Sequence, residues 1–148
     1  MRAFIDGVLN NFPFVAALIC LGISQVLKMS YYYYHEKKID FKHLVEAGGM
    51  PSSHSALVSG LATGVGLQSG WASPAFAMAI IFSSIVMYDA AGVRQAASKQ
   101  ARILNQMLAE GHFDGEKLQE LIGHTPVEVF MGALLGIFLT LGLFRWFY

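Results

Sequence analysis

Two short segments each place a histidine just before an apolar run. The first, GGMPSSHSA, extends from Gly48 to Ala56, and no formally charged side chain follows it until Asp89. The second, GHTPVE, extends from Gly123 to Glu128 and again precedes an apolar run. Histidine exchanges a proton near neutral pH, and the unpaired N–H groups at a helix start attract anions. The two segments therefore indicate proton-transfer chemistry on an anionic group.

The first segment has the composition of a phosphate-binding loop. Gly48 and Gly49 can adopt positive φ and direct successive backbone N–H groups into a concavity. Ser52 and Ser53 add hydroxyl donors, and His54 adds a proton donor. The alternative is purely structural, with one serine capping the following helix. Both interpretations remain open from the sequence.

The second segment has the same ambiguity at Glu128. Thr125 and Glu128, with Pro126 between them, match a capping box with proline at the first helical position. Glu128 also lies four residues after His124, close enough on a helix for its carboxylate to orient the imidazole. Capping and orientation are therefore equally supported roles for this carboxylate.

Three further charged residues fall near the ends of apolar runs. Asp89 is costly beside a membrane unless it has a partner, which indicates an ion pair. Arg94 offers a forked cation suited to phosphate oxygens, or to a salt bridge or lipid headgroup. Lys28 lies near the end of the first apolar run, where it can face a cavity or extend to the membrane surface. These three side chains complete the candidate substrate-binding set.

The composition is that of a membrane protein. Hydrophobic residues make up 55% and charged residues 14% of the 148 residues, against about 25% charged in an ordinary soluble domain. Mean hydropathy is +0.49 and the formal net charge is +0, so nothing indicates nucleic-acid binding. The one cysteine, Cys20, excludes an internal disulfide framework.

The hydropathy pattern predicts an all-α integral membrane protein with one domain, residues 1–148, built as a bundle of about four transmembrane helices. Spans are expected near 12–34, 53–69, 74–90 and 126–147. The second and third fold back at the polar turn from Gln68 to Pro74. An amphipathic helical region is expected between spans three and four, from Val93 to Leu108, followed by a shorter helix from Asp114 to Ile122.

Lysine and arginine orient these spans. The loop between spans one and two and the loop between spans three and four are basic, whereas the turn near Gly70 carries no positive charge. Because such charges prefer the cytoplasmic side, both histidine segments are expected at the cytoplasmic face, in the inner membrane of a bacterial cell. The sequence leaves open whether copies associate as a homo-oligomer.

Three motifs together carry a resemblance to a known family. GGMPSSHSA, VMYDAAGVR (Val86 to Arg94) and GHTPVEV, in this order with apolar spans between them, resemble the small divergent membrane branch of the superfamily of type 2 phosphatidic acid phosphatases and vanadium-dependent haloperoxidases. The resemblance covers most of the chain, from Gln25 to the last span.

The resemblance implies phosphate-ester chemistry without a cofactor or an obligatory metal. Pro51-Ser52-Ser53-His54 is similar to the superfamily's Pro-Ser-Gly-His motif, which makes His54 the general acid. His124 with Glu128 is similar to the nucleophilic histidine and its orienting aspartate. The implied substrate is a membrane lipid phosphate or prenyl diphosphate. The superfamily's Lys-(six residues)-Arg-Pro motif is absent, and Lys117-Leu118 stands where a Ser-Arg pair is expected.

Two alternative functions remain. A non-catalytic lipid-headgroup-binding or scaffold protein would keep the anion-binding loops without turnover. A metal-dependent membrane hydrolase would use His54, Asp89, His124 and Glu128 as an N/O ligand set. No compact ligand spacing supports the metal site. The leading hypothesis is therefore a phosphatase that acts through a phosphohistidine intermediate.

The orientation can be tested by cysteine labelling. Lys38→Cys and His112→Cys are expected to react with a membrane-impermeant maleimide only from the cytoplasmic side, and Gly70→Cys only from the other side, because the positive-inside rule fixes the two basic loops. Labelling of positions 38 and 112 from opposite sides would separate the two histidine segments and contradict a shared site.

Overall fold

The computed structural model describes residues 1–37, 49–111, 115–120 and 123–147, and within them every regular element is an α-helix. The all-α prediction is confirmed. In chain order the helices are α1 (Arg2–Leu9), α2 (Phe12–Glu36), α4 (Ser53–Ser69), α5 (Pro74–Ala91), α6 (Val93–Ala109) and α7 (Pro126–Phe147).

Local capping residues determine where the apolar helices begin. The side chain of Asn11 accepts the N–H of Phe14 at the start of α2, and Ser73 accepts the N–H of Phe76 at the start of α5. Such caps satisfy N–H groups that the helix itself leaves unpaired. Gly70 has φ 88° in the turn that separates α4 from α5, a conformation that a side chain would strain.

Helix α4 is the centre of the bundle. It packs against α2, α5 and α7, and along its length small residues are buried, among them Ser55, Ala56, Gly60 and Gly64. A helix with neighbours on three sides needs small side chains around its circumference. Lipid tails are as apolar as these neighbours, so close packing has to hold the bundle together.

Glycines and hydroxyls make the closest contacts of α4. A Cβ on Gly64 would lie 2.8 Å from Cα of Pro13 in α2, and a Cβ on Gly136 in α7 would collide with Ser59 and Ala56 of α4. The Ser59 hydroxyl donates to the carbonyl of Ala133 at 3.1 Å. The regularly spaced small residues of α4 and α7 therefore lie where the helices contact one another.

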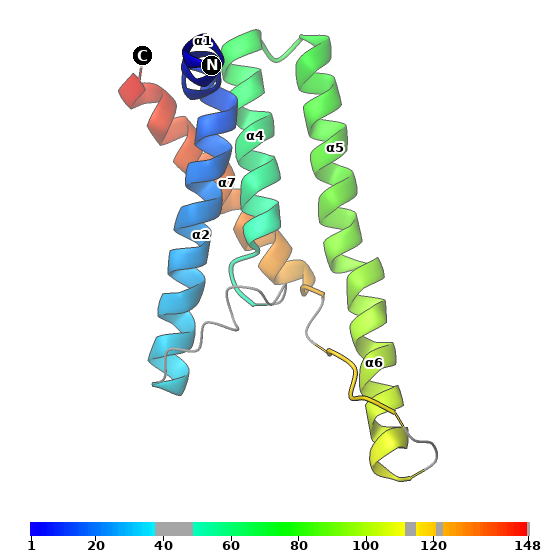
Figure 1. Cartoon of the computed structure of the whole chain (residues 1–148). Helices are drawn as coiled ribbons and strands as arrows, with labels where there is room; N and C mark the ends of the chain where they lie inside the picture. Colours follow the sequence, from blue (N-terminus) through cyan, green and yellow to red (C-terminus); the bar gives the residue numbers. More distant parts are fainter. Residues whose placement is uncertain (38–48, 112–114, 121–122, 148) are drawn as a thin grey trace.

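The connections of the bundle gather at its two ends (Figure 1). The termini and the α4–α5 turn lie at one end. The segment leading into α4, the α5–α6 junction and the segment leading into α7 are grouped toward the other. The two histidine segments therefore share one end of the bundle. Which side of the membrane this end faces stays a prediction.

Three described helical segments are long and apolar enough to cross a membrane, namely 12–34, 74–109 and 126–146. The second joins α5 to α6, and Figure 1 shows α6 continuing nearly in line with α5. Helix α4 has 17 residues and spans about 26 Å, less than the roughly 30 Å of a hydrocarbon core. The structure thus supports an integral membrane protein.

The helix expected from Asp114 to Ile122 is wrong over the residues described. Residues 115–120 contain no helix. The side chain of Asn105 on α6 instead donates to the carbonyl of Leu118 and accepts its N–H, both at 2.8 Å. This two-sided contact, together with a bond from Asn105 to Glu120, takes the place of hydrogen bonds within a helix.

The contact of α7 with α4 can be tested by adding one methyl group. Gly136→Ala is expected to lower the free energy of unfolding by about 1–3 kcal/mol, because its Cβ meets Ser59 and Ala56. Gly142→Ala, on the same helix with no atom near its Cβ position, should be neutral or up to about 1 kcal/mol stabilising. Thermal unfolding in one detergent measures both, and equal midpoints would contradict the packing.

Candidate functional site

The segment before α7 is held against the end of α5 and the start of α6. The backbone N–H of His124 donates to the carbonyl of Ala90 at 3.1 Å. The N–H of Gly123 donates to the hydroxyl of Ser98 at 3.0 Å. A Cβ on Gly123 would collide with the backbone of α6, so glycine permits this close approach. Contacts from two other helices therefore fix the position of His124.

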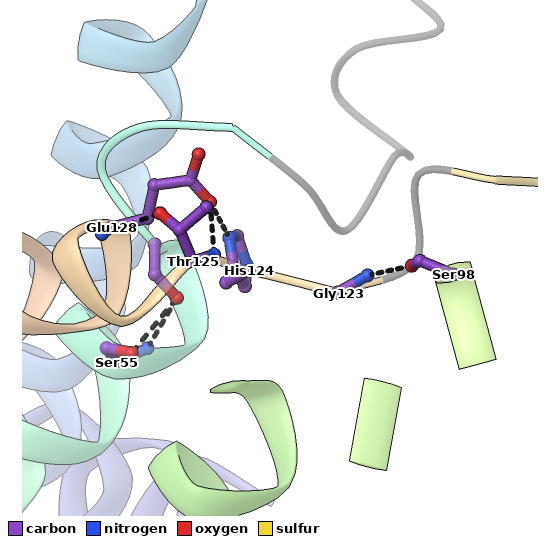
Figure 2. A network of polar contacts seen from close by, with 7 residues as sticks. Ser55, Ser98, Gly123, His124, Thr125 and Glu128 are labelled. Carbon is purple, nitrogen blue, oxygen red and sulfur yellow. Dashed lines mark hydrogen bonds and ion pairs between the residues drawn. The ribbon is translucent and has the colours of Figure 1, made fainter. Parts of the chain in front are cut away.

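One carboxylate oxygen of Glu128 makes both contacts that the sequence offered as alternatives. Oε2 lies 3.1 Å from Nδ1 of His124 and accepts the N–H of Thr125 at 3.0 Å. The N–H of Glu128 in turn donates to the hydroxyl of Thr125 at 3.3 Å. Figure 2 shows this carboxylate oxygen joined to both residues. The capping box therefore places Glu128 where it also holds the imidazole.

The contact with Glu128 determines which nitrogen of His124 carries the proton. An ionised carboxylate only accepts hydrogen bonds, so a neutral His124 has its proton on Nδ1 and a lone pair on Nε2. The His124 side chain is only 2% exposed. Its Nε2 is buried and has no hydrogen-bond partner among the described residues. An unsatisfied buried nitrogen is uncommon in folded proteins, which makes Nε2 the candidate reacting atom.

Burial holds the pKa of His124 below its ordinary value, because the charged imidazolium loses its hydration. The hydrogen bond and negative charge of Glu128 act in the opposite direction and raise this pKa. The nearby His54 and Lys28 lower it further when they are positively charged. The net effect favours neutral His124, the form with a lone pair on Nε2.

The loop before α4 lies directly beside this histidine. The rings of His54 and His124 are 6.5 Å apart between centroids, edge to face. The N–H of Ser52 donates to the carbonyl of Glu128 at 3.1 Å, which joins the two segments through their backbones. Histidines separated widely in the sequence thus meet in one place.

Ser52 and Ser53 have different roles in this loop. Ser52 is fully buried and caps α4 by accepting the N–H of Ser55 at 3.3 Å and its hydroxyl at 3.0 Å. Ser53 is 3.5 Å from the amide nitrogen of Gln25. The capping interpretation therefore applies to Ser52. The hydroxyl of Ser53 can still donate to an anion.

The glycine pair is partly described. Gly49 has φ 101°, and a Cβ there would lie 2.7 Å from the Tyr32 hydroxyl and 3.0 Å from Cε of Lys28. Gly49 thus lets the loop approach two side chains of α2 closely. Gly48 lies outside the described residues.

The two candidate cations occupy different surroundings. Lys28 is 1% exposed, and its charge acts on both histidines. Arg94 is about half exposed, and its Nε donates to Oδ2 of Asp89 at 2.7 Å. Asp89 is therefore the ion-pair partner of Arg94. The charge of Arg94 also acts on His54, which brings both cations to the histidine site.

Tyr32 is a neighbour of this site that the sequence did not indicate. It belongs to a run of four tyrosines typical of a membrane interface, and only the structure shows that Tyr32 faces Gly49. Tyr32 follows Lys28 by four residues on α2, so helical spacing was the available signal.

In the described ranges, no three side chains of histidine, cysteine, aspartate or glutamate are close enough to hold a metal ion.

Comparison with known proteins shows the family of the chain. The family model described as "Divergent PAP2 family" matches residues 9–139. The chain belongs to the divergent PAP2 family. The chain is similar to the uncharacterized membrane protein YuiD of Bacillus subtilis (strain 168). The two sequences are 41% identical over an alignment of 155 residues, which covers 95% of this chain and 98% of YuiD. No solved structure matches.

Membership of the divergent PAP2 family confirms the resemblance inferred from the three motifs. The matched range contains both histidine segments and the Asp89–Arg94 pair. It ends within α7, after the last residue of the candidate site.

The effect of Glu128 on His124 can be measured directly. Glu128→Gln is expected to lower the pKa of His124 further, because the carboxylate that favours the imidazolium is gone while the desolvation remains. An NMR titration of isotope-labelled histidine in detergent, assigned with His124→Gln, reports this pKa. The exposed Glu116→Gln is the matched control and should leave it unchanged. A rise of the His124 pKa in Glu128→Gln would contradict the hydrogen bond.

Proposed function

We propose that the protein is a membrane phosphatase that hydrolyses a lipid phosphate or prenyl diphosphate through a phosphohistidine intermediate. The main support is His124, whose Nδ1 contacts Glu128 while the buried Nε2 has no partner among the described residues. A neutral imidazole held in this tautomer has its lone pair on the nitrogen opposite the carboxylate. This is the form that a nucleophilic histidine requires.

The first step transfers the phosphoryl group to His124. The lone pair of Nε2 forms a P–N bond while the P–O bond to the leaving group breaks. The electron pair of that bond goes to the leaving oxygen, and His54 donates its proton to this oxygen. The carboxylate of Glu128 stabilises the positive charge that develops on the His124 ring.

The second step returns the site to its starting state. Neutral His54 accepts a proton from water as the water oxygen attacks phosphorus. The P–N bond breaks, its electron pair returns to Nε2, and inorganic phosphate leaves. Both histidines then have their original protonation states, so the cycle needs only water as a co-substrate.

Positive charge and N–H donors would bind the phosphate oxygens. Lys28 and Arg94 both act electrostatically on His54, Gly49 provides a close backbone approach, and Ser53 supplies a hydroxyl. Electrostatic stabilisation of this kind is the larger part of phosphoryl-transfer catalysis. Lys28 and Arg94 would replace the cations of the superfamily motifs that this sequence lacks.

We place this site at the cytoplasmic face of a bacterial inner membrane, with α2, α4, α5 and α7 as four spans and α6 outside the hydrocarbon core. The charge distribution of the loops supports the orientation. The short α4 is compatible with a span because it packs against α2, α5 and α7. Association of copies into a homo-oligomer remains part of the hypothesis.

A headgroup-binding protein without turnover is the second candidate. The observation that favours it is the burial of Nε2, which leaves the nucleophile covered in this structure. The superfamily's Ser-Arg pair is also replaced by Lys117-Leu118, and Leu118 is bonded to Asn105 on α6. Under this alternative the protein binds phosphate headgroups and releases no phosphate.

The two histidines are expected to respond differently to substitution. His124→Ala should abolish the acid-labile phosphoenzyme and phosphate release, because no Nε2 remains to attack phosphorus. His54→Ala should reduce release from a lipid phosphate by about 10²–10⁴-fold, yet still form the phosphoenzyme from an aryl phosphate, because that leaving group needs no proton. Phosphate release and trapped phosphoenzyme from purified protein in detergent measure both.

The pH dependence is the second readout of the same experiment. Wild-type activity should fall toward acid as the pH passes through the lowered pKa of His124, because the protonated imidazole has no lone pair on Nε2. It should also fall toward alkali when His54 loses its proton. Binding of headgroups by an inactive wild type would favour the second candidate, and trapping of phosphate on His54 would reverse the two roles.

A further inference from the structure

A long apolar groove lies between α2 and α7 beside the candidate site. Its volume is 610 Å³, within the range of about 300–1,000 Å³ typical of small-molecule sites. It is lined by Leu27 and Tyr31 of α2, Met50 and Pro51 of the loop, and five α7 side chains from Met131 to Leu139. Apart from the tyrosine hydroxyl, the side chains that form it are apolar.

Each of the three segments that line the groove also provides a residue of the candidate site. On α2, Leu27 in the groove is followed by the buried Lys28. In the loop, Pro51 is followed by Ser52, which is bonded to the backbone of α7. On α7, Met131 follows Glu128 by three residues, which is nearly one helical turn. The groove therefore lies next to the histidine site, on the same three segments of the chain.

From the site the groove continues along α7 and is open to the surroundings of the bundle. Met131 and Leu139 are eight residues apart on α7, a rise of about 12 Å. Leu27 and Phe138 are 43% and 66% exposed, so the groove opens sideways. On a membrane helix this opening faces lipid tails, which gives a hydrocarbon chain direct entry from the bilayer.

A second apolar cavity does not lie next to the site. It has a volume of 260 Å³ and lies between α4, α5 and α7, beside Trp71 and Phe76. Trp71 belongs to the α4–α5 turn, which Figure 1 places at the opposite end of the bundle. None of its lining residues belongs to the candidate site. Of these two cavities, the α2–α7 groove is the one that lies beside the charged groups of the candidate site.

We propose that the α2–α7 groove binds one hydrocarbon chain of the substrate while its phosphate occupies the site formed by His54, Lys28 and His124. This inference rests on the proposed function and specifies the substrate as a phosphate or diphosphate on a single long apolar chain. A buried cation at one end and an apolar groove leading away from it match such an amphiphile. An isoprenyl chain and an acyl chain share this chemistry.

Photo-crosslinking locates the chain without requiring turnover. The probes are long-chain phosphonates with a diazirine at the distal end of an isoprenoid or a straight chain, added to the full-length protein in phosphatidylcholine nanodiscs. Labelling is expected on α7 around Phe138 and Leu139, at the end of the groove away from the site, at least tenfold above that by a long-chain alcohol with the same diazirine. The more strongly labelling phosphonate identifies the chain type.

Two labelling results would overturn the proposal. Equal labelling by the alcohol would mean that the groove takes up bulk lipid, and labelling centred on α5 would place the chain elsewhere. A disulfide between two copies through Leu135→Cys that the phosphonate does not prevent would make a second copy of the chain the occupant, which also overturns it.

Blocking the groove provides an independent measurement. Leu135→Trp is expected to lower kcat/KM for a long-chain phosphate at least tenfold more than for a small aryl phosphate, because the indole fills the space of the chain. Met131→Ala, which widens the groove, should shift the preference toward the bulkier isoprenoid chain. The matched control is Leu18→Trp on the exposed side of α2, outside the groove, which should retain the wild-type ratio. Unchanged ratios in both groove variants would overturn the proposal.

The two hypotheses fail in different ways. Chain labelling in the groove without phosphate release from any substrate would remove the proposed phosphatase and leave the chain site. Phosphate release with labelling elsewhere would leave the phosphatase and remove the chain site.

Discussion

The close approach of α7 to α4 is the contact on which the candidate site depends. Gly132 packs directly against the carbonyl of Ser52, and Gly136 packs against Ser59 and Ala56. Without a Cβ at either position, the two helices come close enough for the Ser52 N–H to donate to the carbonyl of Glu128. This bond joins the starts of two helices, and each start carries a histidine. The site therefore follows from helix packing between glycines.

The polar groups at this junction can be buried at little cost in free energy because most of them are hydrogen-bonded. Glu128 satisfies the start of α7 and holds His124 with the same oxygen, while Ser52 satisfies the start of α4. Removing polar atoms from water is costly unless they are bonded. Among the described residues, two buried side-chain atoms have no hydrogen bond, Nε2 of His124 and Oε1 of Gln25. An unsatisfied buried nitrogen such as Nε2 is suited to bind a reacting group.

The arrangement explains how a protein of 148 residues can combine a polar site with an apolar surround. The candidate reactive groups come from helix starts, where unpaired N–H groups and the helix dipole favour anions. The buried Lys28 adds positive charge from the side of α2. Immediately beside these groups, the same helices present apolar side chains to a groove. Charge and hydrophobic surface thus meet within one or two helical turns.

Much of the fold was predictable because its signals are local. The starts of α5 and α7 are marked by Ser73-Pro74 and Thr125-Pro126, and the lack of charge identifies the apolar runs. The segment 115–120 was not predictable, because Asn105 on another helix satisfies its backbone. The helix propensity of that segment contains no information about a hydrogen-bond partner on another helix.

The sequence by itself determined that the chain is an all-helical membrane protein of the divergent PAP2 family. It also indicated which histidines to consider, because apolar runs, caps and motifs depend only on residues close together in the sequence. Only the tertiary structure decided that Glu128 both caps α7 and holds His124, and that Tyr32 and Lys28 face Gly49. The spacing of Thr125, His124 and Glu128 permits either role for the carboxylate. The observed geometry allows both at one oxygen, and distances between helices depend on packing that no local pattern encodes.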